Sequence, residues 1–162
     1  KCYAEYIFME KKLNKVVLSL GSNIGERREN LSLAYEHVEK QIGKIVKSSS
    51  FYENPSQGFD SNNDFINSCI AIETTAGCRE VLDKIHWIEK SMGRKRTKEG
   101  YEDRIIDIDI IFYNNHIVDE DGLKVPHPNY HKRDFVLIPL NELNFLTDPR
   151  QKFQTSNEKM DK

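Results

Sequence analysis

The apolar positions of the chain follow two periods, which predict an alternation of strands and helices. Short runs rich in β-branched and aromatic residues predict four buried strands, at residues 15–20, 45–52, 65–73 and 105–113. Apolar residues spaced by three and four positions predict two long helices, one from Leu31 to Ile42 and one from Val81 to Met92. Each helical pattern stops at a glycine, Gly43 or Gly93, as helices often do.

The predicted order β-α-β-β-α-β is that of the ferredoxin-like motif, in which helices pack on an antiparallel sheet. The strand order within the sheet follows from this motif and not from residue spacing. Further along, extended pieces around Ile117 and Val125 predict a hairpin, and residues 134–143 predict a short helix interrupted by Pro139. We therefore expect an α+β fold with a ferredoxin-like βαββαβ core, an antiparallel sheet flanked by helices, and an added C-terminal hairpin and short helix.

The length of 162 residues fits one domain with a single core. Because the chain begins at Lys1 and not at Met, we interpret residues 1–12 as an extension, an artificial or fusion remnant. We expect a single catalytic domain over residues 13–150 and a polar C-terminal tail over residues 151–162.

Composition narrows the class of protein. The formal net charge of -2 gives no general attraction to nucleic acid or to an anionic membrane. Three cysteines, without a C-x-x-C spacing, argue against a disulfide framework or a zinc site and favour a reducing compartment. The apolar runs are far shorter than the roughly 20 residues of a membrane span. We expect a cytoplasmic protein that binds neither nucleic acid nor membrane, with a monomer as the default state.

The fourth predicted strand carries a pair of carboxylates. Side chains alternate across a strand, so Asp107 and Asp109 face one side, roughly 7 Å apart, while Ile106, Ile108, Ile110 and Phe112 supply the core on the other. Two neighbouring carboxylates repel each other, and a hard divalent cation such as Mg²⁺ removes that cost. The alternative is the solvated face of an edge strand. The hydrophobic character of the opposite face favours a central strand and a metal site.

Basic residues gather just before this strand: Arg94, Lys95, Arg96, Lys98 and Arg104. Arginine forks beside a carboxylate-bound metal suit a polyphosphate, because they neutralise charge that develops during phosphoryl transfer. A solvated charged loop is the alternative, and proximity to the aspartates favours the phosphate interpretation.

Three further features suggest ligand contacts, each with a plainer alternative. Glu89 falls on an apolar helix face, where it could bind a ligand or form a salt bridge. His127 and Arg133 together could hold phosphate, although His127 alone would suggest a surface turn. Phe65 and Asn67 share a strand face, which suits a flat heterocycle or an ordinary core. The chain lacks the G-x-x-x-x-G-K-[ST] and G-x-G-x-x-G loops, so arginines and metal would have to hold a nucleotide.

With these residues assembled, the chain resembles the 6-hydroxymethyl-7,8-dihydropterin pyrophosphokinase family from about Val16 to Leu143. The R-x-x-D-x-D-hydrophobic segment is the family's signature. The matching segments are LSLGSNIG (18–25), SSFYENP (49–55), DFINSCIAIET (64–74), IEKSMGR (88–94), RIIDIDIIF (104–112), VPHP (125–128) and RDFVLIPL (133–140).

The resemblance implies transfer of pyrophosphate from ATP to the hydroxymethyl group of the reduced pterin, with release of AMP, in folate biosynthesis. It implies that Asp107 and Asp109 bind two Mg²⁺ ions and that Arg94 and Arg104 stabilise the transferring group. The implied ATP contacts are Glu89, Arg96, Ile110, His127 and Arg133. The implied pterin contacts are Asn54, Pro55, Gln57, Phe65, Asn67, Tyr101 and Phe135.

Some positions depart from the family pattern. Tyr101 stands where the family often has Trp, Glu102-Asp103 replace the residues that usually precede the signature arginine, and Gln57 replaces an apolar pocket residue. Two other functions stay open at this point: a palm-type metal-dependent nucleotidyl transferase, and a ferredoxin-like ligand-binding module without catalysis. The first predicts affinity for nucleic acid, which the net charge does not favour.

Overall fold

The computed structural model describes residues 12–54, 64–93 and 105–151, and all elements given below lie in these three ranges. The main sheet contains β1 (Asn14–Ser22), β2 (Lys44–Ser48), β3 (Tyr52–Asn54), β4 (Phe65–Thr74) and β5 (Asp107–Tyr113). Its order is β2-β4-β1-β5, with β3 also paired to β4, and every pairing is antiparallel. The two long strands, β1 and β4, therefore lie side by side at the centre, as the ferredoxin-like motif predicts.

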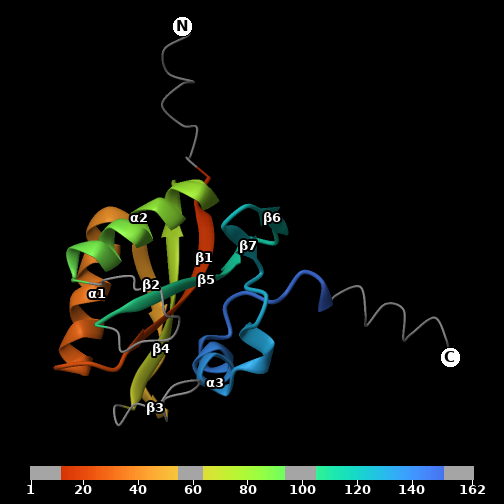
Figure 1. Cartoon of the computed structure of the whole chain (residues 1–162). Helices are drawn as coiled ribbons and strands as arrows, with labels where there is room; N and C mark the ends of the chain where they lie inside the picture. The colour runs from red at the N-terminus through yellow and green to blue at the C-terminus, as the bar shows by residue number, and fades with distance from the viewer. Residues whose placement is uncertain (1–11, 55–63, 94–104, 152–162) are drawn as a thin grey trace, which may run out of the picture.

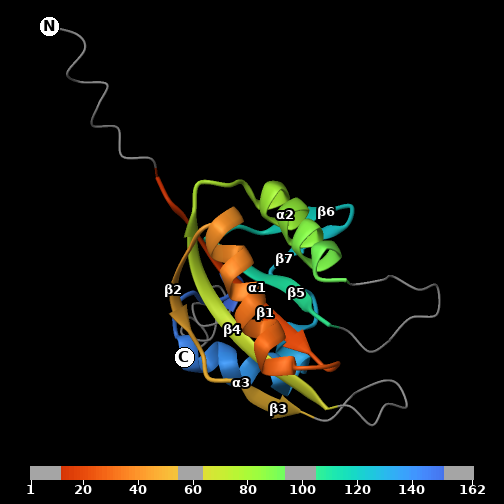
Figure 2. The ribbon, with the colours of Figure 1, turned by 90° about the vertical axis from the view of Figure 1, so that its left-hand side faces the viewer.

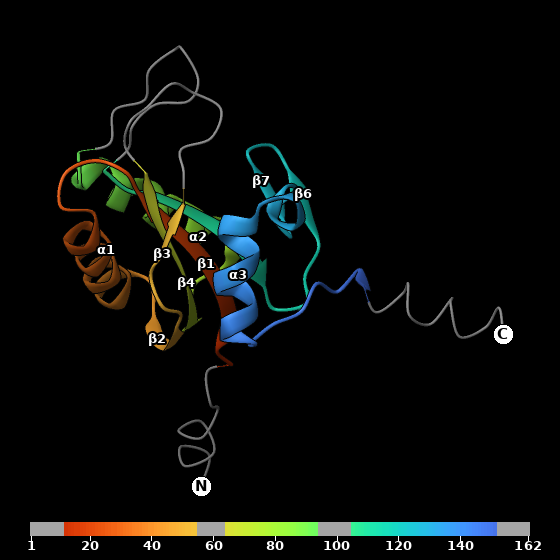
Figure 3. The same cartoon turned by 90° about the horizontal axis from the view of Figure 1, so that it is seen from below.

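Three helices cover this sheet from two sides. Helices α1 (Arg27–Gln41) and α2 (Cys78–Ser91) lie on one face, and α3 (Asp134–Leu143) lies on the other (Figures 1, 2 and 3). The predicted hairpin is present as β6 (Val118–Glu120) and β7 (Leu123–Val125), followed by a short 3-10 helix, η2 (Tyr130–Lys132). Figure 1 shows the hairpin beside β5 and away from α1. The mixed α/β class and the added C-terminal elements are thus confirmed.

The two glycines that end the predicted helices do so for different reasons. Gly93 follows α2 with φ 91°, a left-handed conformation that favours glycine. Gly43 follows α1 where a side chain would collide with the carbonyl oxygen of Glu73 in β4. The first glycine is required by backbone conformation and the second by a close approach of two backbones.

Two predicted elements differ from the structure. The strand expected over 45–52 is divided into β2 and β3, because Ser49 inserts its hydroxyl into the ladder and accepts the amide of Cys69 at 2.9 Å. The helix expected to break at Pro139 is continuous. Val136, Leu140 and Leu143 anchor α3 to the sheet around this proline, so burial compensates for the missing backbone donor.

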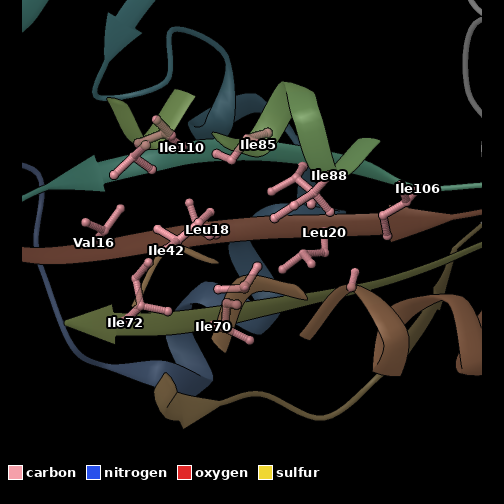
Figure 4. Packing of buried hydrophobic residues seen from close by; sticks show 14 of the residues in the cluster. Val16, Leu18, Leu20, Ile42, Ile70, Ile72, Ile85, Ile88, Ile106 and Ile110 are labelled. Carbon is pink, nitrogen blue, oxygen red and sulfur yellow. The ribbon is translucent and has the colours of Figure 1, made fainter. Parts of the chain in front are cut away.

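The core consists of two clusters, one on each side of the sheet. The larger cluster joins Val16, Leu18 and Leu20 of β1 to Ile85 and Ile88 of α2, as Figure 4 shows. The smaller cluster lies under α3. Its buried members are Val17, Cys69, Ala71, Ile111, Phe112, Tyr130, Val136, Leu140 and Leu143. Alternate residues of β1 belong to the two clusters, so each face of the sheet packs against a different set of helices.

A β-bulge changes the faces of β5 part of the way along. Val17 pairs with Phe112 and Leu18 with Ile110, so Ile111 has no counterpart on β1. Phe112 consequently joins the cluster under α3. The prediction that Phe112 shares a face with Ile106, Ile108 and Ile110 was therefore wrong, because strict alternation does not continue through a bulge.

Candidate functional site

Helix α3 covers only part of its sheet face, and polar side chains occupy the remainder. Strand register places Tyr52, Asn67, Gly21 and Asp107 in one row across β3, β4, β1 and β5. Side chains in such a row stand on the same face of the sheet. Residues that lie far apart in the sequence thus meet along one line.

The two aspartates share this face, as predicted. Asp109 pairs with Ser19 of β1, and Asp107 pairs with Gly21 two residues further on. Both side chains are half-buried, while Ile108 between them is buried on the opposite face. However, β5 is an edge strand that pairs with β1 alone among the described strands, so the expected central position was wrong. The other face of β5 is hydrophobic because α2 packs against it.

Gly21 leaves room for two of the predicted heterocycle contacts. A β-carbon at this position would lie 2.6 Å from Asn67 Oδ1 and 3.5 Å from Phe65 Cδ1. Glycine is therefore needed here so that Asn67 and Phe65 can occupy the space above β1. Gly21 had no predicted role, although its position directly after the predicted strand at residues 15–20 was a signal for one.

Asn67 carries an unsatisfied hydrogen-bond donor. The residue is 4 % exposed. Its Nδ2 is the only buried side-chain nitrogen or oxygen without a partner in the part of the chain that the structure describes. Leaving such a donor unpaired costs about 1–3 kcal/mol. An orphaned amide beside an aromatic ring is what a site for a flat, hydrogen-bonding ligand requires.

His127 lies at the β5 end of this face. Its backbone N–H donates to the carbonyl of Ile111 at 3.0 Å, and its Nδ1 accepts the amide of Asn129 at 3.1 Å. Burial and the nearby Arg133 guanidinium lower the pKa of His127 to about 4, against the opposing effect of Asp107. The ring is therefore neutral at pH 7, with its proton on Nε2 and available to a ligand acceptor.

Arg133 stands between η2 and α3. Its guanidinium lies over the ring of Phe135, 5.7 Å from the centroid. Its carbonyl accepts the first helical amides of α3, those of Val136 and Leu137. Arg133 and Phe135, predicted for ATP and pterin respectively, therefore lie together at the start of α3.

Glu89 is a buried carboxylate, 3 % exposed, on the face of α2 that meets the sheet. Its Oε2 accepts the amide of Ile108 at 3.2 Å. The sequence left a ligand contact and a salt bridge open for Glu89, and in the structure its carboxylate binds a backbone group of β5. The ATP contact of Glu89 remains a prediction.

Ile110 lies on the other side of the sheet from the aspartates. Its side chain is buried between the sheet and the helices. Its backbone lies on β5, which pairs with β1 alone among the described strands. Any contact between Ile110 and a nucleotide would therefore come from its backbone.

Asn54, one of the implied pterin contacts, is the last residue of β3 and pairs with Phe65 of β4.

Six of the predicted site residues lie outside the described residues: Pro55, Gln57, Arg94, Arg96, Tyr101 and Arg104. Within the described ranges, no group of three or more His, Cys, Asp or Glu side chains forms a complete metal site. Two half-buried carboxylates on one strand face still provide the hard oxygen donors that Mg²⁺ prefers, and such a site commonly takes its other ligands from phosphate and water. The residues present thus fit Mg²⁺ as a partner of a polyphosphate.

Together, the fold and this face define a class: a ferredoxin-like domain with a carboxylate pair on the edge strand β5 and a buried amide and an aromatic ring on the central strand β4. A model of the 7,8-dihydro-6-hydroxymethylpterin-pyrophosphokinase (HPPK) family matches residues 17–145. This protein belongs to that family.

Relatives from several organisms agree with this membership. The chain is 37 % identical over 131 residues to "2-amino-4-hydroxy-6-hydroxymethyldihydropteridine pyrophosphokinase" of Porphyromonas gingivalis, covering 79 % of this chain and 89 % of the relative. It is 41 % identical over 129 residues to the protein of the same name from Aquifex aeolicus, covering 79 % of each. "Folic acid synthesis protein FOL1" of Dictyostelium discoideum is 38 % identical over 136 residues, 82 % of this chain but 20 % of the relative.

Solved structures share the fold. Wild-type HPPK-DHPS of Plasmodium falciparum, solved with pteroate, superposes with a TM-score of 0.66 at 19 % identity. The superposition covers 92 % of this chain and 43 % of that one, so this chain corresponds to less than half of that protein. None of the comparisons favours a nucleotidyl transferase or a non-catalytic module. Among the described residues, no helix has the length and apolar character needed to cross a membrane.

Proposed function

We propose that this protein transfers the terminal pyrophosphoryl group of ATP to the hydroxymethyl oxygen of 6-hydroxymethyl-7,8-dihydropterin and releases AMP. One observation carries the assignment to this face: the row that joins Asp107 at the edge of the sheet to the orphaned amide of Asn67 at its centre. Family membership supplies the reaction, and the row supplies a place for each substrate.

The heterocycle lies at the Asn67 end of the row. A pterin has donors and acceptors along the edge of a flat ring system, and Asn67 Nδ2 can donate to one of its acceptors. The rings of Phe65 and Phe135 provide apolar surface for the faces of the heterocycle. Asn54, Pro55, Gln57 and Tyr101 belong to the same proposed subsite by resemblance. This arrangement would bring the hydroxymethyl group toward Asp107.

The triphosphate lies at the Asp107 end. Asp107 and Asp109 would hold Mg²⁺ there, two ions by resemblance to the family. Bound Mg²⁺ supplies charge neutralisation to the phosphates and acidifies a coordinated hydroxyl. Neutral His127 donates from Nε2 to a phosphate oxygen, and Arg133 adds a fixed positive charge. Arg94, Arg96 and Arg104 complete the proposed phosphate site, and Glu89 and Ile110 lie on the side proposed for the nucleoside.

The chain's own residues then contribute mainly by positioning and charge. The attacking oxygen must approach the β-phosphorus in line with the leaving AMP oxygen, and two subsites placed along one row of the sheet favour that approach. The negative charge that leaves with AMP is stabilised by the arginines. No general base is assigned among these residues.

Product identification tests the proposal. The protein is incubated with ATP, Mg²⁺ and 6-hydroxymethyl-7,8-dihydropterin, and the nucleotide products are separated by chromatography. We expect AMP in amounts equal to the pterin consumed, and no AMP when pterin is omitted. Formation of ADP, release of free pyrophosphate, or lack of turnover would contradict the proposal. We also propose a monomeric, cytoplasmic enzyme, which sedimentation and cell fractionation can test.

A further inference from the structure

The C-terminal turn of α3 is fastened to the segment that leads into β3. The carboxylate of Glu142 accepts the amide of Ser50 at 3.0 and 3.1 Å through its two oxygens, and the hydroxyl of Ser50 at 2.9 Å. It also accepts the hydroxyl of Tyr52. Three donors from one short segment thus converge on a single side chain of α3.

These hydrogen bonds fix the charge of each partner. The bonds from Tyr52 and Ser50 hold the pKa of Glu142 below its usual range, while Glu142 raises the pKa of Tyr52. Near pH 7 the carboxylate is therefore ionised and the phenol keeps its proton. Hydrogen bonds to an ionised acceptor are shorter and stronger than neutral ones.

Tyr52 connects this cluster to the candidate site. It pairs directly with Asn67 across β3 and β4, so the two side chains stand next to each other on one face. β3 is only three residues long, and its ladder alone gives it little support. Its position beside Asn67 therefore depends on what holds Tyr52.

The opposite end of α3 carries Phe135 and Arg133, which border the same face. α3 thus contacts one edge of the site through its first turn and the strand beside Asn67 through its last turn. A rigid helix held at both ends sets the separation between Phe135 and the β3–β4 pair.

We propose that Glu142, acting through Tyr52 and Ser50, is a positioning residue that sets the width of the heterocycle subsite. This inference rests on the proposed function. It differs from a role in stability alone, because it predicts a selective effect on the pterin. The side chain of Glu142 itself does not touch substrate in this arrangement.

The test compares Glu142→Gln, Tyr52→Phe and the double variant in steady-state assays with both substrates. We expect the KM for pterin to rise at least roughly threefold in each single variant, while the KM for ATP stays within about twofold. The double variant should be no worse than the more affected single one, because both remove the same interaction.

A matched control separates positioning from folding. Tyr113→Phe removes a different tyrosine hydroxyl bond, the buried 2.7 Å contact with the carbonyl of Ala76 near α2, whereas the contact of Tyr52 with Glu142 is exposed. It should lower the thermal midpoint without changing the KM for pterin. If Glu142→Gln fails to fold, the KM for pterin of Tyr52→Phe, which keeps the aromatic ring, tests the inference by itself.

Two results would overturn the inference. One is an unchanged pterin KM in the folded single variants of an active enzyme. The other is an equal rise in the KM for ATP, which would indicate a general loss of structure. An inactive wild-type protein would instead contradict the proposed function itself, so the two failures are distinguishable.

Discussion

The carboxylate of Glu89 accepts the amide of Ile108, the residue that separates Asp107 from Asp109. A buried side chain of α2 thereby fixes the outer edge of β5 between the two aspartates. An edge strand needs such support, because its outer backbone groups have no neighbouring strand.

Glu89→Leu should destabilise the protein. It leaves the buried amide of Ile108 without this acceptor, which costs about 1–3 kcal/mol in the free energy of unfolding. Glu89→Gln keeps an acceptor oxygen and should lose less. Urea unfolding measures both. Glu80→Gln, on the exposed side of the same helix and paired with Lys84 at 3.4 Å, is the control and should change little. Equal losses in all three variants would argue against the role of the Ile108 contact.

Gly21→Ala should weaken pterin binding and leave the fold intact. The new methyl group meets Asn67 Oδ1 at 2.6 Å, so the amide must move, whereas no backbone atom lies that close. We expect a rise of roughly tenfold or more in the dissociation constant for pterin, equivalent to about 1.4 kcal/mol. Equilibrium titration of pterin fluorescence measures it.

Two other glycines serve as controls for this substitution. Gly77→Ala places its methyl group in open space and should behave like the wild type. Gly43→Ala meets the backbone of Glu73 and should destabilise the fold instead. Wild-type pterin affinity in a folded Gly21→Ala protein would contradict the proposed position of the heterocycle.

Asp107→Asn and Asp109→Asn should each lower turnover by at least roughly a hundredfold, the order of loss seen when one charge-stabilising group is removed from an active site. Both side chains are half-buried at an edge, so the thermal midpoint should change little. Asp119→Asn, on the exposed strand β6, is the matched control. Rates are measured across a Mg²⁺ titration. An unaltered Mg²⁺ dependence in either variant would exclude that aspartate as a metal ligand.

The neutral state of His127 predicts a pH dependence of stability. Its pKa is about 4 in the folded protein and 6.5 as its ordinary value. Between these pH values the unfolded chain binds a proton that the folded chain does not, so unfolding becomes more favourable as pH falls. The stabilising contribution is complete above about pH 6.5 and is lost progressively toward pH 4.

Replacing the histidine tests this dependence. His127→Gln should flatten the loss of stability between pH 6.5 and 4, and exposed His116→Gln should not. Denaturant unfolding at several pH values measures the difference between each variant and the wild type. Parallel curves for His127→Gln and the wild type would show that the histidine is protonated in both states.

Local patterns predicted most of the helices and strands. Alternation along β5 placed Asp107 and Asp109 on one face, and the element order predicted the sheet. Two predictions were wrong because contacts between distant residues determine the outcome. Phe112 follows a bulge, and β5 is an edge strand whose second face is buried by α2. The contacts of Glu89 and Glu142 could not be predicted, because each depends on which backbone amide tertiary packing brings near.

The bulge in β5 affects strand pairing and the position of His127 in different ways. Ile111 has no counterpart on β1, yet its carbonyl accepts a hydrogen bond from the amide of His127. Deleting Ile111 would let Phe112 and Ile110 keep their present partners in an unbroken ladder. The same deletion would remove the anchor that places His127 beside Asp107. Because Ile111 is also a buried member of the cluster under α3, we expect the shortened chain to be less stable as well as to lose the position of His127 beside Asp107.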